Sequence, residues 1–109
     1  MVKSDKSKYI GEYSEGNRHG YGIHIIPKTG DAYIGQYSDD CSEGLGIFKF
    51  GSLGESYAGD WTQGLFNGTG VYKYSDGGRY VGQFEMDKKH GLGVVVKQDS
   101  LTLVKMERD

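Results

Sequence analysis

The side chains that most often carry chemistry are scarce in this chain of 109 residues, which contains three histidines and one cysteine. His19 and His90 precede Gly-x-Gly motifs, and the corresponding residues before two other such motifs are Glu43 and Asn67. A catalytic group needs a nucleophile, a base and an orienting residue together, and no arrangement of these residues supplies them. Three scattered histidines and Cys41 also lack the spacing of a metal site. We therefore expect no enzymatic activity, no bound metal and no cofactor.

The Gly-x-Gly motifs themselves invite comparison with phosphate-binding loops, whose backbone N–H groups cradle a phosphate at the start of a helix. In this chain the motifs lack the third glycine of the dinucleotide fingerprint, and they lead into predicted strands rather than helices. A nucleotide site is therefore not expected. The four motifs are Gly20/Gly22, Gly44/Gly46, Gly68/Gly70 and Gly91/Gly93.

Composition excludes several classes of protein. Nineteen glycines with one proline do not fit collagen, and the 14 aromatic residues (nine Tyr, four Phe and one Trp) argue against disorder. Each glycine inside a helix costs about 1 kcal/mol relative to alanine, so long helices are disfavoured. A net charge of −2 gives no indication of a nucleic-acid partner. The chain has no apolar run of the roughly 18 residues that a membrane span needs, and no apolar secretory segment. With one cysteine and no internal disulfide, we expect a cytoplasmic protein.

A four-fold repeat organises the glycines and aromatic residues. The phrase Tyr-x-Gly-x-aromatic recurs at spacings of 24, 24 and 23 residues, and a Gly-x-Gly motif follows each copy. The opening phrases are Tyr9-Ile10-Gly11-Glu12-Tyr13, Tyr33-Ile34-Gly35-Gln36-Tyr37, Tyr57-Ala58-Gly59-Asp60-Trp61 and Tyr80-Val81-Gly82-Gln83-Phe84. The predicted segments of this single domain are a flexible lead at 1–8, repeats at about 9–32, 33–56, 57–79 and 80–100, and a capping strand or tail at 101–109.

Within each unit the pattern alternates with period two, which predicts strands. Segments such as 14–19 are typical of hairpin loops, and segments such as 27–30 are typical of turns into the next unit. Each unit is thus predicted to form one β-hairpin. The expected fold is all-β: an elongated, twisted, single-layer antiparallel sheet made of consecutive hairpins.

Twelve of the 14 aromatic residues are predicted to lie on the face that carries the glycines, with Tyr21 and Phe66 as the exceptions. Glycine inside a strand weakens it by roughly 0.5–1 kcal/mol. We expect aromatic rings to fold over the glycine backbone in compensation, leaving one exposed aromatic surface along the array. The residues assigned to this structural scheme are Tyr9, Gly11, Gly20, Gly22, Tyr33, Gly35, Gly44, Gly46, Tyr57, Gly59, Gly68, Gly70, Tyr80, Gly82, Gly91 and Gly93.

The repeat resembles the MORN (membrane occupation and recognition nexus) repeat, whose pattern is close to Tyr-x-Gly-x-aromatic followed by Gly and Gly-x-Gly. The resemblance covers about residues 9–97. In two units the hairpin glycine seen at Gly16 and Gly64 is replaced by Asp40 and Asp87, so these two loops are expected to differ in shape. The fourth unit also lacks the late aromatic residues of the second and third.

The resemblance implies an interaction module, from a family linked to peripheral membranes, phosphoinositide-related proteins, the cytoskeleton and cell division. Our first hypothesis is a scaffold that binds a helix or peptide along an aromatic groove, and the open sheet edges would also allow a homodimer. The alternatives are a peripheral membrane or phosphoinositide-binding module, and the targeting domain of a larger signalling enzyme such as a phosphoinositide kinase. The residues expected to line the groove are Tyr13, Tyr37, Trp61, Phe84, Phe48 and Tyr72.

Two tests bear on these hypotheses. If the groove binds a partner, Trp61→Ala or Tyr37→Ala should weaken capture without unfolding; if these residues are core, the array should unfold instead.

Lipid binding through charge requires clustered Lys and Arg. The hairpin loops alternate between basic, acidic and neutral, and Lys3, Lys6 and Lys8 are too few for such a cluster. The sequence therefore predicts no basic stripe along the array.

Overall fold

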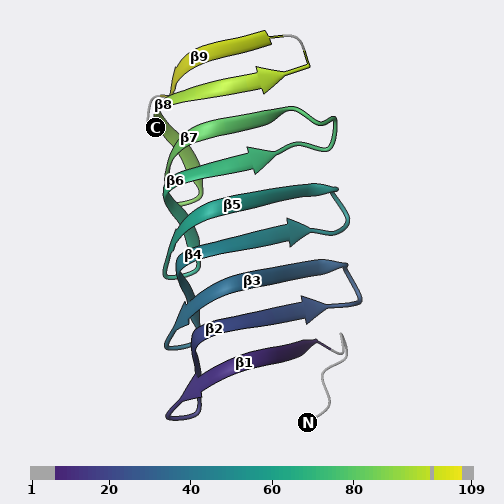
Figure 1. The fold of residues 1–109 in the computed structure, drawn as a ribbon, viewed down its shortest axis with the longest axis vertical. Helices are drawn as coiled ribbons and strands as arrows, with labels where there is room; N and C mark the ends of the chain where they lie inside the picture. The colour runs from purple at the N-terminus through teal and green to yellow at the C-terminus, as the bar shows by residue number, and fades with distance from the viewer. Residues whose placement is uncertain (1–6, 99, 107–109) are drawn as a thin grey trace.

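The computed structural model describes residues 7–98 and 100–106, which form one open antiparallel sheet. The strands pair strictly in chain order, and the array measures 47 × 25 × 23 Å (Figure 1). The predicted all-β, single-layer fold is confirmed. The predicted lead falls mostly on residues 1–6, outside the described part, as do residues 107–109 of the predicted tail. The strands are β1 (Lys8–Ser14), β2 (Asn17–Ile26), β3 (Asp31–Ser38), β4 (Cys41–Phe50), β5 (Glu55–Thr62), β6 (Leu65–Lys73), β7 (Arg79–Glu85), β8 (Lys88–Lys97) and β9 (Ser100–Met106).

Each repeat is a hairpin closed by a two-residue turn in which both central residues have positive φ. This is the type I′ geometry that matches the right-handed twist of the strands. Gly16 and Gly64 have φ of 83° each, and Asp40 and Asp87 have φ of 69° and 71°. The expectation that the two aspartate loops differ in shape is therefore wrong, because Asp tolerates the left-handed conformation better than most residues with a Cβ.

A register shift interrupts every hairpin directly after the glycine of the tyrosine phrase, opposite the strand that carries the Gly-x-Gly motif. The first glycine of the motif has positive φ in all four units, as expected of a glycine bulge. In the third unit, a Cβ on Gly68 would meet the side chain of Asp60, whose Oδ2 accepts the Thr69 N–H at 3.0 Å. Four glycines assigned to ring packing thus have another role, which is to form the bulge: Gly20, Gly44, Gly68 and Gly91.

The structure corrects the position expected for Phe66. Phe66 pairs directly across from Trp61, while Gly70 pairs with Gly59. β6 has two more residues than β5 between these pairs, so Phe66 and Gly70 lie on the same face, and Phe66 stacks on Tyr57 at 4.0 Å between ring centroids. The prediction that Phe66 lies off the aromatic face is therefore wrong, because the expected hairpin loop is only the two-residue turn Gln63-Gly64 and Phe66 belongs to strand β6.

Rings do cover the remaining eight strand glycines, two under each opening tyrosine. A Cβ on Gly46 would lie 2.5 Å from Cζ and 2.6 Å from Cε1 of Tyr33. The tyrosine hydroxyl then donates a hydrogen bond to the carbonyl three residues on, where the register shifts. The four bonds are Tyr9 to Glu12 at 2.8 Å, Tyr33 to Gln36 at 2.8 Å, Tyr57 to Asp60 at 2.7 Å and Tyr80 to Gln83 at 3.2 Å.

The core is a zigzag of rings that runs along the array. Each opening tyrosine makes an edge-to-face contact with the second aromatic of its own unit, and the first three also contact that of the next unit, at centroid distances of 5.0–5.3 Å. Trp61 adds a buried hydrogen bond from Nε1 to the carbonyl of Gly46 at 3.0 Å. The buried residues are Tyr33, Tyr37, Tyr57, Trp61, Tyr80 and Phe84.

Candidate protein-binding site

The six residues expected to line a groove do not lie at one depth. Tyr37, Trp61 and Phe84 are each 5% exposed, so the expectation that the second aromatics form an exposed surface is wrong for these three. Each is covered by the tyrosine of the preceding unit as well as its own. Tyr13 has no preceding unit among the described residues and is 60% exposed. Phe48 and Tyr72 are half-buried.

A groove does exist, displaced from the expected line. Its walls are the half-buried rings of β4 and β6, with Trp61 and Phe84 beneath them. Two adjoining hollows of about 410 and 180 Å³ share Phe66 and Asp87 in their lining. Successive rings lie 4.6–6.3 Å apart between centroids. We name this set the central groove: Phe48, Phe50, Phe66, Tyr72 and Tyr74.

Three members of the central groove were not predicted from the sequence. Phe50 and Tyr74 were expected on the aromatic face, but they lie late in their units and were not assigned to the groove. Phe66 was not expected on the aromatic face. The available signal was that the first and fourth units have Ile26 and Lys97 where the second and third have Phe50 and Tyr74. A cluster confined to the middle of the array was therefore already present in the sequence.

Charged groups border the central groove. The Tyr72 hydroxyl donates to Oε1 of Glu55 at 2.8 Å. Burial, with that hydrogen bond as a smaller contribution, raises the pKa of Tyr72 to about 12. Lys89 Nζ lies 4.9 Å from the Tyr74 ring centroid, a cation–π contact, and the exposed Lys88 is beside it. The groove therefore has an apolar floor, with the acidic groups Glu55 and Asp87 and the cations Lys88 and Lys89 in its lining.

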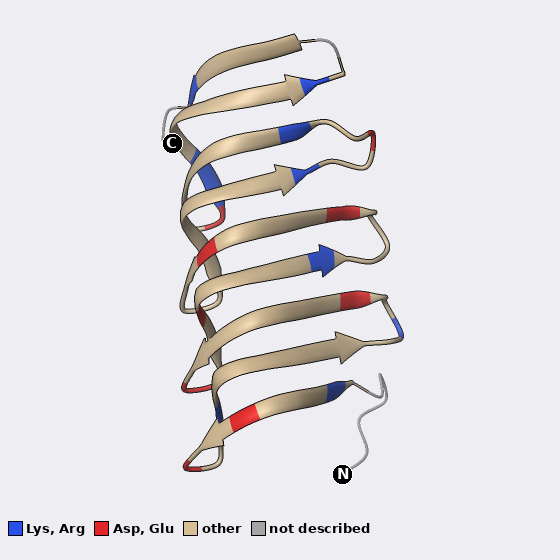
Figure 2. Cartoon of the chain, in the orientation of Figure 1, with Lys and Arg blue, Asp and Glu red and all other residues tan. Residues whose placement is uncertain are grey.

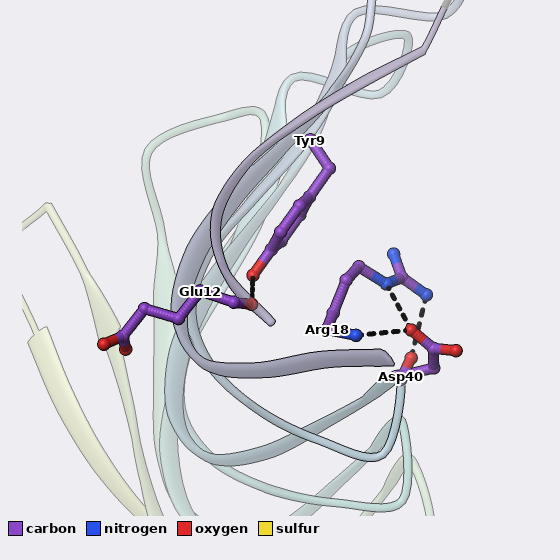
Figure 3. A network of polar contacts seen from close by, with 4 residues as sticks. All are labelled: Tyr9, Glu12, Arg18 and Asp40. Atoms are coloured by element: carbon purple, nitrogen blue, oxygen red, sulfur yellow. Dashed lines mark hydrogen bonds and ion pairs between the residues drawn. The ribbon is translucent and has the colours of Figure 1, made fainter. Parts of the chain in front are cut away.

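A second polar feature joins the first two hairpins (Figure 3). Asp40 Oδ1 accepts the Arg18 backbone N–H at 2.7 Å and pairs with Arg18 Nε at 3.2 Å. These bonds, the backbone N–H first among them, lower the pKa of Asp40. The Arg18 guanidinium also lies 5.0 Å from the Tyr37 ring centroid. Figure 3 shows Tyr9 and Arg18 on the inner side of the bent hairpin and the Glu12 carboxylate on the outer side.

The tips of neighbouring hairpins are joined by backbone hydrogen bonds as well. In each case an N–H of the later turn donates to a carbonyl of the preceding hairpin. Glu43 and Asn67 strengthen two of these contacts by accepting from Gln63 N and Met86 N. Such contacts hold the central groove open at a fixed width, because its walls belong to different repeats. The bonds are Asp40 to Arg18 at 3.0 Å, Gly64 to Ser42 at 2.9 Å and Asp87 to Phe66 at 2.9 Å.

The outer face, opposite the rings, carries a continuous row of aliphatic side chains. The register aligns one such residue from each strand. We name this row the aliphatic ladder: Ile10, Ile23, Ile34, Ile47, Ala58, Val71, Val81, Val94 and Leu103. Ten of the 13 exposed large hydrophobic residues in the described part of the chain lie on this face, either in the ladder or beside it.

The rows on the two sides of the ladder differ in charge. On the side of the inter-repeat turns, the register aligns Lys8, Lys49, Lys73 and Arg79 with uncharged neighbours. On the hairpin side lie two acids, Glu12 and Asp60, and one cation, Lys105. In Figure 2 blue segments mark one end of β1, β4, β6, β7 and β8, where β3 and β5 have red segments, and red segments also mark the other end of β1 and β5. The prediction that no basic stripe runs along the array is wrong, because it considered only the hairpin loops.

The chemically capable side chains are dispersed. His19 is exposed, His90 Nδ1 lies 3.8 Å from Glu85 Oε1, and His24 is on the aromatic face across from Tyr9. Cys41 is exposed. Residues 7–98 and 100–106 contain no group of three His, Cys, Asp or Glu placed to hold a metal ion. The same residues form no helix that is long and apolar enough to cross a membrane.

Comparison with protein-family models identifies the MORN repeat four times, at residues 9–28, 33–54, 57–79 and 80–102. A search of curated proteins finds no match. The four matched segments follow the four hairpins, each with a tyrosine over two glycines and a bulge glycine between them. Since they span most of its length, the chain belongs to the MORN repeat family.

Proposed function

We propose that this chain is a non-enzymatic scaffold that binds an apolar helix or peptide of a protein partner in the central groove. The observation that carries the proposal is the set of five half-buried rings, above which the described residues form no further layer. Aromatic side chains supply large contact area at low entropic cost, which suits the centre of a protein interface. The buried ring zigzag beneath keeps the groove rigid, so little ordering is needed on binding.

The shape and border of the groove favour one kind of partner segment. Its apolar floor accepts hydrophobic side chains from one face of a helix or from alternate positions of an extended peptide. Lys88 and Lys89 at the β8 end favour an acidic residue at the corresponding end of the segment. Glu55 already holds the Tyr72 hydroxyl and is less available to pair with a cation.

A peptide-display selection against the full chain, followed by calorimetric titration of the selected peptides, tests the proposal. We expect the selected peptides to be apolar on one face and to bind Phe50→Ala and Tyr74→Ala at least tenfold more weakly than the wild type. Leu45→Ala is the matched control, because Leu45 is 62% exposed on the outer face. Circular dichroism and Trp61 fluorescence would establish that the variants are folded. Equal binding by groove variants and wild type, or an equal loss in Leu45→Ala, would overturn the proposal.

A further inference from the structure

The aliphatic ladder and its neighbours form an apolar surface larger than an isolated soluble sheet normally shows. Ile10 and Leu103, at the two ends, are 66% and 71% exposed, and Ile34 and Ile47 are 51% and 50% exposed. Ten such side chains, each worth roughly 60–120 Å² of burial, amount to about 800 Å². The largest apolar patch on a typical monomer is about 300–600 Å². A standard protein interface buries about 800 Å² on each partner.

We propose that two copies of this chain pack ladder against ladder through a two-fold axis that runs along the array. The ladder has one residue per strand, and a two-fold axis along the array brings each residue against its own copy in the second chain along the whole row. Face-to-face packing of two sheets, about 10 Å apart, supplies the second layer that a single sheet lacks on this side. The interface uses the face opposite the central groove and is independent of the proposed function.

The charges beside the ladder select one of the two symmetric orientations. With the axis along the array, the row of Lys8, Lys49, Lys73 and Arg79 faces the partner's acidic row. Lys8 then lies opposite the second copy's Glu12, and Lys49 lies near its Asp60. With the axis along the strands, four cations would face the same four cations, which is repulsive. The four cations are exposed and are in no ion pair among the described residues.

A second copy fits this face better than an anionic bilayer. Glu12 and Asp60 offset two of the five cations on this face, and the whole chain has a net charge of −2. Binding to anionic lipids gains about 1 kcal/mol for each basic residue near the surface, and the acids oppose that gain. Pairing of two copies uses both signs of charge. The resulting dimer would carry two central grooves that face away from each other.

The mass of the full chain in solution, measured by sedimentation velocity across a concentration range, tests the pairing. We expect about twice the 12.0 kDa of one chain, and a return to 12.0 kDa in Ile47→Lys. Leu53→Lys is the matched control, because Leu53 is 56% exposed but lies in a turn outside the ladder. It should sediment as the dimer. A monomeric wild type, or dimers that Ile47→Lys leaves intact, would overturn the proposal.

Disulfide trapping tests the orientation without depending on a destabilising variant. In a Cys41→Ser background, Ile10→Cys should cross-link to itself, because the two Ile10 positions adjoin only when the arrays point the same way. Self-cross-linking of the Ile10→Cys variant supports a pair of arrays that point the same way, and its absence in a proven dimer refutes that orientation.

Vesicle pelleting tests the alternative occupant. If the wild type is monomeric and pellets with phosphatidylserine vesicles, and Ile47→Lys no longer pellets, this face binds lipid instead.

Discussion

Replacing Gly46 by alanine should destabilise the array through a clash with the ring that lies on it. The added Cβ would lie 2.5 Å from Cζ and 2.6 Å from Cε1 of Tyr33. That ring is 3% exposed, is held between Tyr37 and Trp61 at 5.1 and 5.2 Å, and is tethered by its hydroxyl, so it has little freedom to move. Overpacking of this kind costs about 3 kcal/mol at the upper end of its usual range. Alanine recovers up to about 1 kcal/mol of glycine's entropic cost, which leaves a net loss of about 2 kcal/mol.

The assay is urea unfolding followed by far-ultraviolet circular dichroism. A loss of about 2 kcal/mol lowers the melting temperature of a chain of this size by roughly 10 °C. Gly22→Ala provides an internal comparison, because the ring above it, Tyr9, is at the end of the array and only partly buried. Tyr9 can swing aside, so the loss should be smaller.

Gly16→Asp is the control for the loss of a glycine as such. Gly16 has φ of 83°, no atom lies within 4 Å of the position that a Cβ would take there, and Asp40 and Asp87 already occupy the same turn position. We expect it to cost about 1 kcal/mol or less. If Gly46→Ala unfolds at the wild-type urea concentration, the ring does not rest on this glycine and the packing scheme is refuted.

Three further outcomes are expected. Trp61→Phe removes the buried hydrogen bond to the Gly46 carbonyl and part of a packed ring. It should lower the free energy of unfolding by about 2 kcal/mol in urea titrations followed by circular dichroism. An unchanged urea midpoint would contradict the buried role of the indole. Because the folded chain holds the pKa of the Asp40 carboxyl below its ordinary value of 3.8, its stabilising effect is complete above pH 3.8 and is lost as pH falls through the folded value. The difference in urea midpoint between wild type and Asp40→Gly should therefore shrink well below pH 3.8, and a difference that grows in acid would refute this. Burial raises the pKa of Tyr37 and of Tyr57 to about 12, so their protonated forms stabilise the fold up to pH 10 and this stability is lost as pH rises from 10 to about 12. Ultraviolet absorbance should show their tyrosinate forming together with unfolding, and full ionisation of all tyrosines near pH 10 in the folded array would contradict the burial.

Much of the fold was predictable because the same sequence pattern occurs in four units, so each structural inference is supported four times. A tyrosine two residues before a glycine, repeated at Tyr9, Tyr33, Tyr57 and Tyr80, predicts a strand whose ring covers backbone, and the structure has this geometry in every unit. The bulge was not predicted. The sequence feature that indicates the bulge is the polar residue directly after the glycine of each tyrosine phrase, such as Asp60 after Gly59. Its side chain accepts a backbone N–H that the bulge leaves without a partner in the sheet, here that of Thr69.

The candidate site was less predictable than the fold. The period-two pattern of a strand predicts which face of the sheet a side chain lies on. How deeply that side chain is buried depends on rings from other strands, about 20 residues away in the sequence. Trp61 is buried because Tyr33 and Tyr57 both pack on it, whereas Tyr13 has the same place in its unit and is exposed. Likewise, Lys49 and Lys73 appear in the sequence as isolated charges between aromatic residues. Their alignment in one row follows from a register that neither residue sets alone.

By itself, the sequence determined the number of hairpins, the face of most residues and the pairing of rings with glycines. These features follow from local spacing, because strand geometry alternates side chains and only glycine leaves room for a ring against the backbone. The tertiary structure alone decided which rings are core, where the central groove lies and that aliphatic and basic residues form continuous rows. Those features depend on residues from several neighbouring strands, and the bulges and the hydrogen-bonded register of the whole sheet determine how these residues align.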